Sequence, residues 1–381
     1  MFNIILLGIT SLLTDISSEM VYPILPVFLV TTLGASPAIL GLIEGIAESL
    51  ASLTKVFSGY WSDKIRKRKP FTIFGYASST VGKLILYLAT SWVYVLLARV
   101  IDRFGKGIRT APRDALIADS SGEGKKGAAF GLHRAMDTLG AAIGVAAAYF
   151  LITGFKGNLR NVFLFSLIPA FLGIFFLFFV REKKALPPKT AKQKLEFKWG
   201  KLDKRLKLFL IFTFIFTLGN SSNMFLLLRA KNIGSSIASV ILMYLVYNIV
   251  YALVAYPASR LSDNIGRKKI LVAGYLFYGL VYLGFGINQS IGSLWVLFGM
   301  YGLYIGFTEG AEKALVSDIA PAELRATAIG LHATLVGVGL LPASLLAGLL
   351  WKFFGASAPF YFGGLMGLFA SISFWFILKE L

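Results

Sequence analysis

Long apolar segments recur along this sequence, and each is long enough to cross a lipid bilayer as a helix, which takes about 20 residues. We place twelve of them near residues 3–31, 36–62, 70–90, 93–119, 128–153, 159–180, 206–228, 236–262, 270–288, 292–318, 326–350 and 357–378. Backbone groups inside lipid must be satisfied within their own segment, and the segments are too long for barrel strands. The sequence therefore predicts an all-α membrane protein with twelve transmembrane helices.

The composition supports a membrane protein. Hydrophobic residues make up 56% of the chain and charged residues only 15%, whereas charged residues form about a quarter of a soluble domain. The first segment lacks a basic start and carries Asp15 and Glu19 in its middle, so we expect it to remain as a helix rather than to be cleaved as a signal peptide. Cysteine is absent, which excludes disulfides and thiolate metal sites.

The net charge of +19 is concentrated in alternate connections between the predicted helices. Basic residues crowd 64–69, 125–126, 181–205 and 267–269, and few lie on the opposite side. By the positive-inside rule, this placement predicts a multi-pass protein of the cytoplasmic (plasma) membrane with both termini in the cytoplasm. Topology thus explains the charge better than a nucleic-acid partner does, and the basic loops are expected to contact the lipid surface.

The two halves of the chain repeat each other. SDKIRKRK at 62–69 matches SDNIGRKK at 262–269, and GLHRAMDTLG at 131–140 matches GLHATLVGVG at 330–339, so that His133 and His332 fall on equivalent positions. We therefore predict two pseudo-symmetric six-helix halves in one orientation, at 1–180 and 206–381, joined by a cytoplasmic linker at 181–205. This is a transporter architecture, with a substrate site expected between the halves near the bilayer midplane.

Two loop motifs resemble the signature of the major facilitator superfamily: GYWSDKIRKRK after the second helix and RLSDNIGRKK after the eighth. The fourth helix, LLARVIDRFGKGIRTAPRDALIAD, is similar to the superfamily pattern of an arginine, here Arg99, followed by glycines and a closing aspartate. The resemblance covers essentially the whole chain and implies the superfamily fold and a monomer. It also implies a cytoplasmic gate, formed by Asp63, Asp119, Asp263 and Asp318.

The sequence departs from the superfamily patterns at two places. Asp102 and Arg103 stand where many members have Gln and Gly, and the fifth helix lacks the Gly-Pro pair that marks many antiporters, although Gly140 and Gly144 are present. These differences resemble a prokaryotic branch of the superfamily with many uncharacterised members, and they leave antiport open.

The fourth helix carries a dense set of charges in an apolar setting. Charged groups inside a membrane cost several kcal/mol unless they are paired or hydrated. The spacing pairs Asp102 with Lys106, whereas Arg109 and Arg113 place two like charges on one stripe and need anions. The acids available to them are Asp15, Glu19, Glu44, Glu48 and Asp137.

Two interpretations of these charges remain open. Arginines and acids could form a buried ion-pair network that locks helices together, or they could line a substrate cavity, where arginine suits carboxylate or phosphate. Asp15 or Glu19 could also load and unload protons as exposure alternates.

In the second half, Asn223 matches Glu19, and Glu309 lies four residues before Lys313, a spacing that favours a structural ion pair nearly as much as substrate contact. Pro23, Pro26 and Pro112 are expected to kink or break their helices. The predicted substrate and proton pathway contains Asp15, Glu19, Glu44, Glu48, Arg99, Asp102, Arg103, Arg109, Arg113, Asp114, Asp137, Asn223, Glu309 and Lys313.

These patterns predict a secondary active transporter that moves a small anionic or zwitterionic solute by alternating access, coupled to protons, with export favoured. The alternatives are a multidrug or cationic-solute proton antiporter and a non-transporting receptor or scaffold with the same fold. No phosphate-binding loop, catalytic triad or metal cluster can be assembled from the motifs, since GEGKKG at 122–127 has the wrong spacing. We therefore expect no enzyme activity, no metal and no cofactor.

Overall fold

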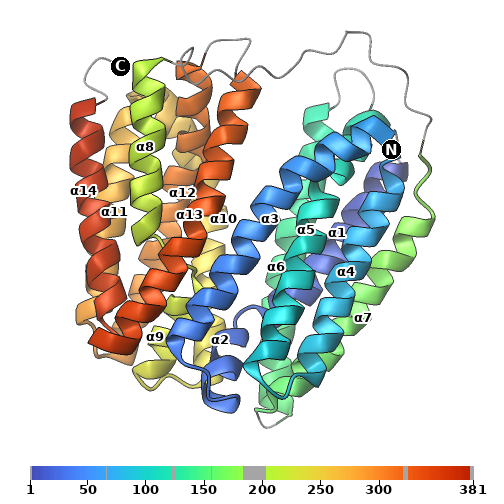
Figure 1. The fold of residues 1–381 in the computed structure, drawn as a ribbon, viewed down its shortest axis with the longest axis horizontal. Coiled ribbons are helices and arrows are strands. Elements are labelled where there is room, and N and C mark those ends of the chain that lie inside the picture. Colours follow the sequence, from blue (N-terminus) through green and yellow to red (C-terminus); the bar gives the residue numbers. More distant parts are fainter. Residues whose placement is uncertain are drawn as a thin grey trace. The chain divides into compact units, whose positions relative to one another are not determined.

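The computed structural model describes residues 2–65, 67–121, 126–155, 157–182, 203–320 and 325–377. Regular structure in these ranges is helical (Figure 1). The elements of the first half are α1 (Phe2–Val21), α2 (Leu25–Val27), the π-helical turn η1 (Phe28–Thr32), α3 (Pro37–Ile65), α4 (Lys69–Leu88), α5 (Trp92–Ser120), α6 (Lys126–Gly154) and α7 (Leu159–Phe178). Those of the second half are α8 (Lys204–Gly219), α9 (Met224–Asn232), α10 (Ile237–Ile265), α11 (Arg267–Ile287), α12 (Ile291–Ile319), α13 (Arg325–Phe354) and α14 (Ala358–Ile377).

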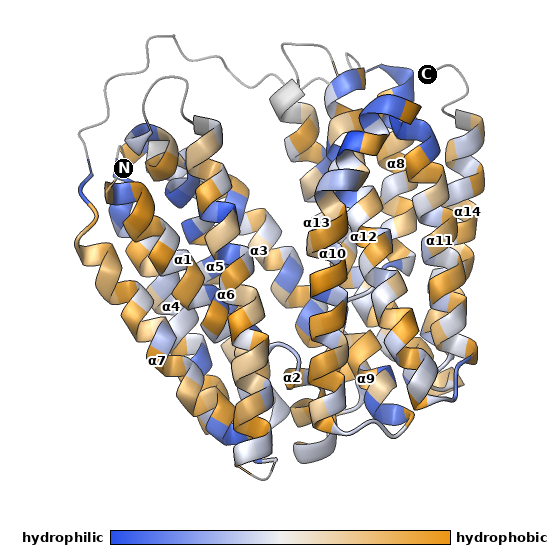
Figure 2. Cartoon of the chain, turned by 180° about the vertical axis from the view of Figure 1, so that it is seen from behind, coloured by the Kyte–Doolittle hydropathy of each residue, from blue (hydrophilic) through white to orange (hydrophobic). Residues whose placement is uncertain are grey.

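The prediction of twelve membrane-spanning helices is confirmed, although two of the twelve are less apolar than the other ten. Within the described ranges, ten helical segments are long and apolar enough to cross a membrane. The other two are α3 and α5, which have the necessary length, 29 residues each, but carry the charges noted above. Figure 2 shows hydrophobic residues along most of the helices and hydrophilic residues interrupting α5.

Proline affects these helices unequally. The first segment was expected to run through 3–31, but α1 ends at Val21 and the chain resumes as α2, where Pro26 lies at the helix start. In contrast, α5 continues through Pro112, so of the kink or break expected there, a break does not occur. The predicted segment 206–228 is also interrupted, between α8 and α9, at the position equivalent to the break after α1. The repeat thus extends to the interruptions.

The chain divides into two compact units. The first unit comprises Met1–Ala185 with Asn223–Leu245, and the second comprises Leu186–Ser222 with Val246–Leu381. Residues 183–202 of the predicted linker lie outside the described ranges, so the boundary at 181–205 stays a prediction.

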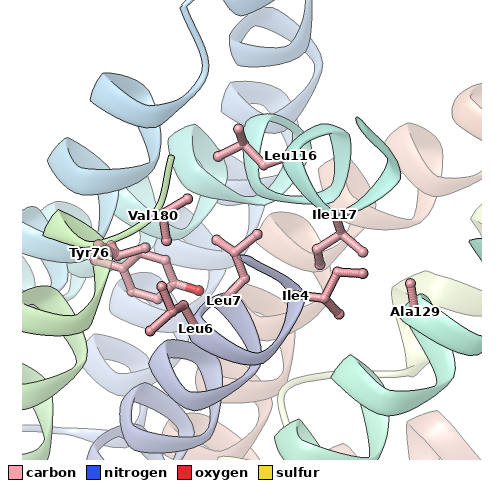
Figure 3. Packing of buried hydrophobic residues seen from close by; sticks show 9 residues of the cluster. Ile4, Leu6, Leu7, Tyr76, Leu116, Ile117, Ala129 and Val180 are labelled. Carbon is pink, nitrogen blue, oxygen red and sulfur yellow. The ribbon is translucent and has the colours of Figure 1, made fainter. Parts of the chain in front are cut away.

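In the first unit, α5 packs against α3 and α4, and α1 packs against α6 and α7. The close approach of α4 to α5 depends on glycine, because a Cβ atom on Gly75 would meet the backbone of Gly105. Small residues permit such contacts between membrane helices. A hydrophobic cluster fixes one end of this unit, where Leu7, Tyr76 and Ile117 lie together (Figure 3). In the second unit, α11 packs against α12 and α14, and α8 packs against α13 and α14.

Candidate functional site

A buried ion pair joins α5 to α3 in the first unit. The Arg99 guanidinium donates from Nε to Glu44 Oε1 at 2.7 Å and from Nη2 to Glu44 Oε2 at 2.9 Å. The side chains are 7% and 0% exposed, so the pair is shielded from water. This two-pronged geometry is the strongest that arginine and carboxylate can adopt.

Further charges extend this pair into a network along α5. Arg103 Nε lies 2.9 Å from Glu48 Oε1, and Asp102 Oδ2 lies 3.6 Å from Arg99 Nη1 and 4.0 Å from Arg103 Nη1. The Asp102 to Lys106 pair that the spacing indicated is absent from the described ion pairs, because Asp102 lies between two arginines instead.

Lys83 of α4 supplies a third cation that the sequence analysis did not single out. Its side chain is buried, and its Nζ donates to Ser18 Oγ at 3.1 Å. Among the acids, Asp102 has the largest electrostatic attraction to Lys83. Lys83, Arg99 and Arg103 are therefore three cations whose charges all act on Asp102. A charged residue inside the predicted segment 70–90 was a signal that could have found it.

Arg109 and Arg113 have different surroundings from Arg99. The Arg109 side chain is buried, its guanidinium carbon lies 4.4 Å from the centre of the Tyr76 ring, and it contacts the Ser79 hydroxyl. Arg113 Nη2 donates to Asp114 Oδ1 at 2.9 Å and Nη1 donates to Ser11 Oγ at 3.2 Å. The acids expected to neutralise these two arginines are thus partly used elsewhere, since Glu44 and Glu48 bind Arg99 and Arg103.

Both acids of α1, Asp15 and Glu19, experience the charge of Lys106 on α5. Glu19 accepts a hydrogen bond of 2.9 Å from the Tyr244 hydroxyl, and Asn223 precedes α9 in the same unit. Asp15 is half-buried and forms no hydrogen bond or ion pair with another described residue. Among the charged groups, Asp137 has the largest electrostatic interaction with Asp15. Asp137 in turn lies 3.6 Å from His133 Nδ1.

In the second unit the predicted intrahelical pair forms, with Lys313 Nζ 2.8 Å from Glu309 Oε1. Tyr251 also donates to Glu309 Oε2 at 2.6 Å. Glu312, one turn further along α12, accepts a hydrogen bond of 2.6 Å from Tyr275. Neither Glu312 nor Tyr275 was singled out from the sequence, because the pair of Glu309 with Lys313 accounted for the charge pattern of that segment.

The aspartates assigned to the cytoplasmic gate lie at helix ends. Arg267 Nη1 is 2.8 Å from Asp263 Oδ1 and also binds Asp318, and Arg68 binds Asp119 in the same way in the first unit. Asp63 lies in α3, but its side chain is outside the described part of the structure. No group of three or more metal-ligating side chains occurs within the described ranges.

Sequence comparison decides the family. The model of the Major Facilitator Superfamily matches residues 7–227 and 208–380. The chain belongs to this superfamily. An uncharacterised MFS-type transporter of Methanocaldococcus jannaschii is 41% identical over 383 residues, which covers 98% of this chain and 94% of that protein. This superfamily member is therefore a multi-pass membrane transport protein.

More distant relatives include the multidrug resistance protein MdtH of Photorhabdus laumondii, 24% identical over 84% of this chain and 79% of that protein. Among solved structures, a mutant form of the nucleoside transporter NupG superposes with a TM-score of 0.83 at 16% identity, covering 99% of this chain and all of that chain. A bacterial homologue of the lysosomal transporter Spinster gives 0.77 at 16% identity, over 99% of this chain and 96% of that one. These structural matches show the same fold.

Proposed function

We propose that this superfamily member is a secondary active transporter that moves a small anionic or zwitterionic solute across the plasma membrane by alternating access, coupled to protons and in the export direction. One observation carries the choice of an anion. Arg99 and Arg103 bind carboxylates, whereas the described contacts of Arg109 are an aromatic face and a hydroxyl group. A solute carboxylate or phosphate would replace the weaker hydroxyl contact with a two-pronged ionic one.

The test is proton release or uptake by the purified, detergent-solubilised protein in weak buffer. Salicylate, ethidium and uridine serve as the anionic, cationic and neutral probes. We expect a signal with salicylate that is lost in Arg109→Ala and kept in Arg260→Ala, a matched control that removes an exposed arginine of α10. A salicylate signal of wild-type size in Arg109→Ala would remove Arg109 from the site.

A cationic-solute proton antiporter is the second candidate, because MdtH and a second relative, from Bacillus subtilis, are multidrug resistance proteins. Asp15 and Glu19 of α1 would then hold the cation. An ethidium signal that survives Arg109→Ala and disappears in Glu19→Gln would favour this function. Silence with all three probes would favour a receptor or scaffold.

The orientation is testable because the chain has no cysteine. We propose that both termini lie in the cytoplasm, which places Ser121 on the cytoplasmic side and Asn158 outside. In intact cells, a membrane-impermeant thiol reagent should label Asn158→Cys and leave Ser121→Cys unlabelled. The reverse pattern would invert the topology.

A further inference from the structure

The repeat brings the same three positions together in each unit. At an offset of 199 residues, Tyr76 corresponds to Tyr275, Arg113 to Glu312 and His133 to His332. The helix contacts follow the same offset, because a Cβ on Gly75 would meet Arg109 and one on Gly274 would meet the side chain of the equivalent Thr308. The tyrosine and histidine are kept in both units, while the charge between them is inverted.

The next position is inverted as well. Arg113 is followed by Asp114, and Glu312 is followed by Lys313. In the first unit these neighbours bind each other at 2.9 Å. In the second unit Lys313 binds Glu309 instead, at 2.8 Å, and leaves Glu312 without a lysine or arginine in the ion pairs of the described residues. The two acids of α12 therefore differ: Glu309 pairs with Lys313 and is 41% exposed, whereas Glu312 pairs with no lysine or arginine among the described residues and is 16% exposed.

Three helices enclose Glu312. From α11, the fully buried Tyr275 donates to Oε1 at 2.6 Å; from α13, His332 Nε2 lies 3.6 Å from Oε2. Phe209 of α8 stacks on the His332 ring with centroids 6.0 Å apart. The other charged or titratable groups that act on Glu312 or lie beside it on α12 are Tyr304, Glu309 and Lys313.

An ionised carboxylate in such a site is costly. Removing an ion from water costs several kcal/mol, and a hydrogen bond from a neutral tyrosine returns only part of that. A proton on Oε2 removes the charge, and the resulting O–H points at His332 Nε2, a buried atom that has no hydrogen-bond partner among the described residues. A shift of a few tenths of an ångström would complete that bond. Arg113 has no such option, because arginine keeps its proton.

We propose that Glu312 is a proton-binding group of the second unit, with Tyr275 and His332 as its positioning residues. The proton comes from water, binds Oε2 and returns to water, and no other bond changes. Its use in transport rests on the proton coupling proposed above. The inversion then has a consequence: the first unit holds a permanent charge at this place, and the second holds one that can be switched.

Infrared difference spectroscopy tests this directly, because a protonated carboxyl group has a C=O stretching band that a carboxylate lacks. We expect the purified wild-type protein at neutral pH to show this band, and Glu312→Gln to show it with lower intensity. Glu309→Gln, one turn away on the same helix, is the matched control and should keep it. A band of wild-type intensity in Glu312→Gln would overturn the proposal.

A second variant covers the case in which Glu312→Gln fails to fold. Tyr275→Phe removes the hydrogen bond to Oε1 and keeps the carboxyl group, so it should shift the frequency of the band without abolishing it. An unshifted band in Tyr275→Phe would mean that the proton is elsewhere. These spectra need no solute, so silence with all three transport probes would contradict the proposed function while leaving the proton site intact.

Discussion

Helices α5 and α12 occupy equivalent places in the two units, yet they are filled with different chemistry. Lys83, Arg99 and Asp102 of the ion-pair network correspond at the offset of 199 to Tyr282, Phe298 and Tyr301. In the second unit these positions are part of an aromatic cluster, in which the ring centres of Tyr282 and Tyr301 lie 6.0 Å apart and those of Phe285 and Phe298 lie 5.3 Å apart. One packing scheme thus accommodates either ions or aromatic rings.

The difference matters for energetics. An aromatic pair contributes about 0.5–1.5 kcal/mol beyond its burial, and it has no charge to leave behind when one ring is removed. A buried ion pair contributes little to the net free energy of folding, but removing one partner leaves the other as an uncompensated buried charge. We therefore expect the α3–α5 contact to depend on every member of its network, and the equivalent contact in the second unit to tolerate change better.

The largest expected effect comes from breaking the network. Arg99→Ala should lower the free energy of unfolding by about 3–5 kcal/mol, because it strands Glu44 in a dry site. Denaturant titration in detergent micelles measures this. The double variant Arg99→Gln with Glu44→Gln removes both charges and should recover most of the loss. Equal losses in Arg99→Ala and in the double variant would show that the charge left on Glu44 is not the cause of the loss.

Glycine substitutions should distinguish the two units at equivalent positions. A Cβ on Gly107 would lie 2.7 Å from the backbone oxygen of Ala51, whereas one on Gly306 would first meet the Val254 side chain at 3.0 Å. Overpacking typically costs about 1–3 kcal/mol. The loss in the free energy of unfolding should lie near the upper end of this range for Gly107→Ala and near its lower end for Gly306→Ala. The reason is that a side chain can move aside more easily than the backbone. The same titration checks the order, and a larger loss in Gly306→Ala would contradict it.

A smaller effect is expected within the aromatic cluster. Tyr278 donates to the Gly219 carbonyl oxygen at 2.9 Å, and Tyr278→Phe removes the hydroxyl group that makes this hydrogen bond. The free energy of unfolding should fall by about 1 kcal/mol. Phe285→Leu, in the same cluster, controls for packing without hydrogen bonding. A loss above about 3 kcal/mol in Tyr278→Phe would mean that the hydroxyl belongs to a larger polar network.

The smallest effect is expected at the helix ends. Asp318 binds Arg267, but its side chain is 54% exposed, and exposed ion pairs contribute about 0–1 kcal/mol. Asp318→Asn should leave the free energy of unfolding nearly unchanged. Asp119→Asn, its equivalent in the first unit, should do the same. A loss of several kcal/mol in either variant would show that these aspartates are structural anchors.

The sequence predicted the helices and the repeat because both depend on local composition and spacing. It predicted the pair of Glu309 with Lys313 within one helix, but not which charges meet between helices. The pairing of Arg99 with Glu44 depends on how α3 crosses α5, and that crossing is set by contacts such as Gly107 against Ala51, which no spacing within one helix reveals. The sequence indicated a need for anions near Arg109 and Arg113 because these two like charges are four residues apart. Glu312 was missed because its partners come from α11 and α13, far away in the sequence.

Two of the glycines described above occupy equivalent positions in both halves of the chain. Gly75 and Gly107 reappear as Gly274 and Gly306, whereas the neighbouring ionisable residues have been exchanged, inverted or lost. If the halves arose by duplication of a six-helix ancestor, the inherited part includes these two glycine positions at the helix contacts, and the chemistry diverged around them. A reconstruction of that ancestor should therefore begin from its glycines and leave its charges to experiment.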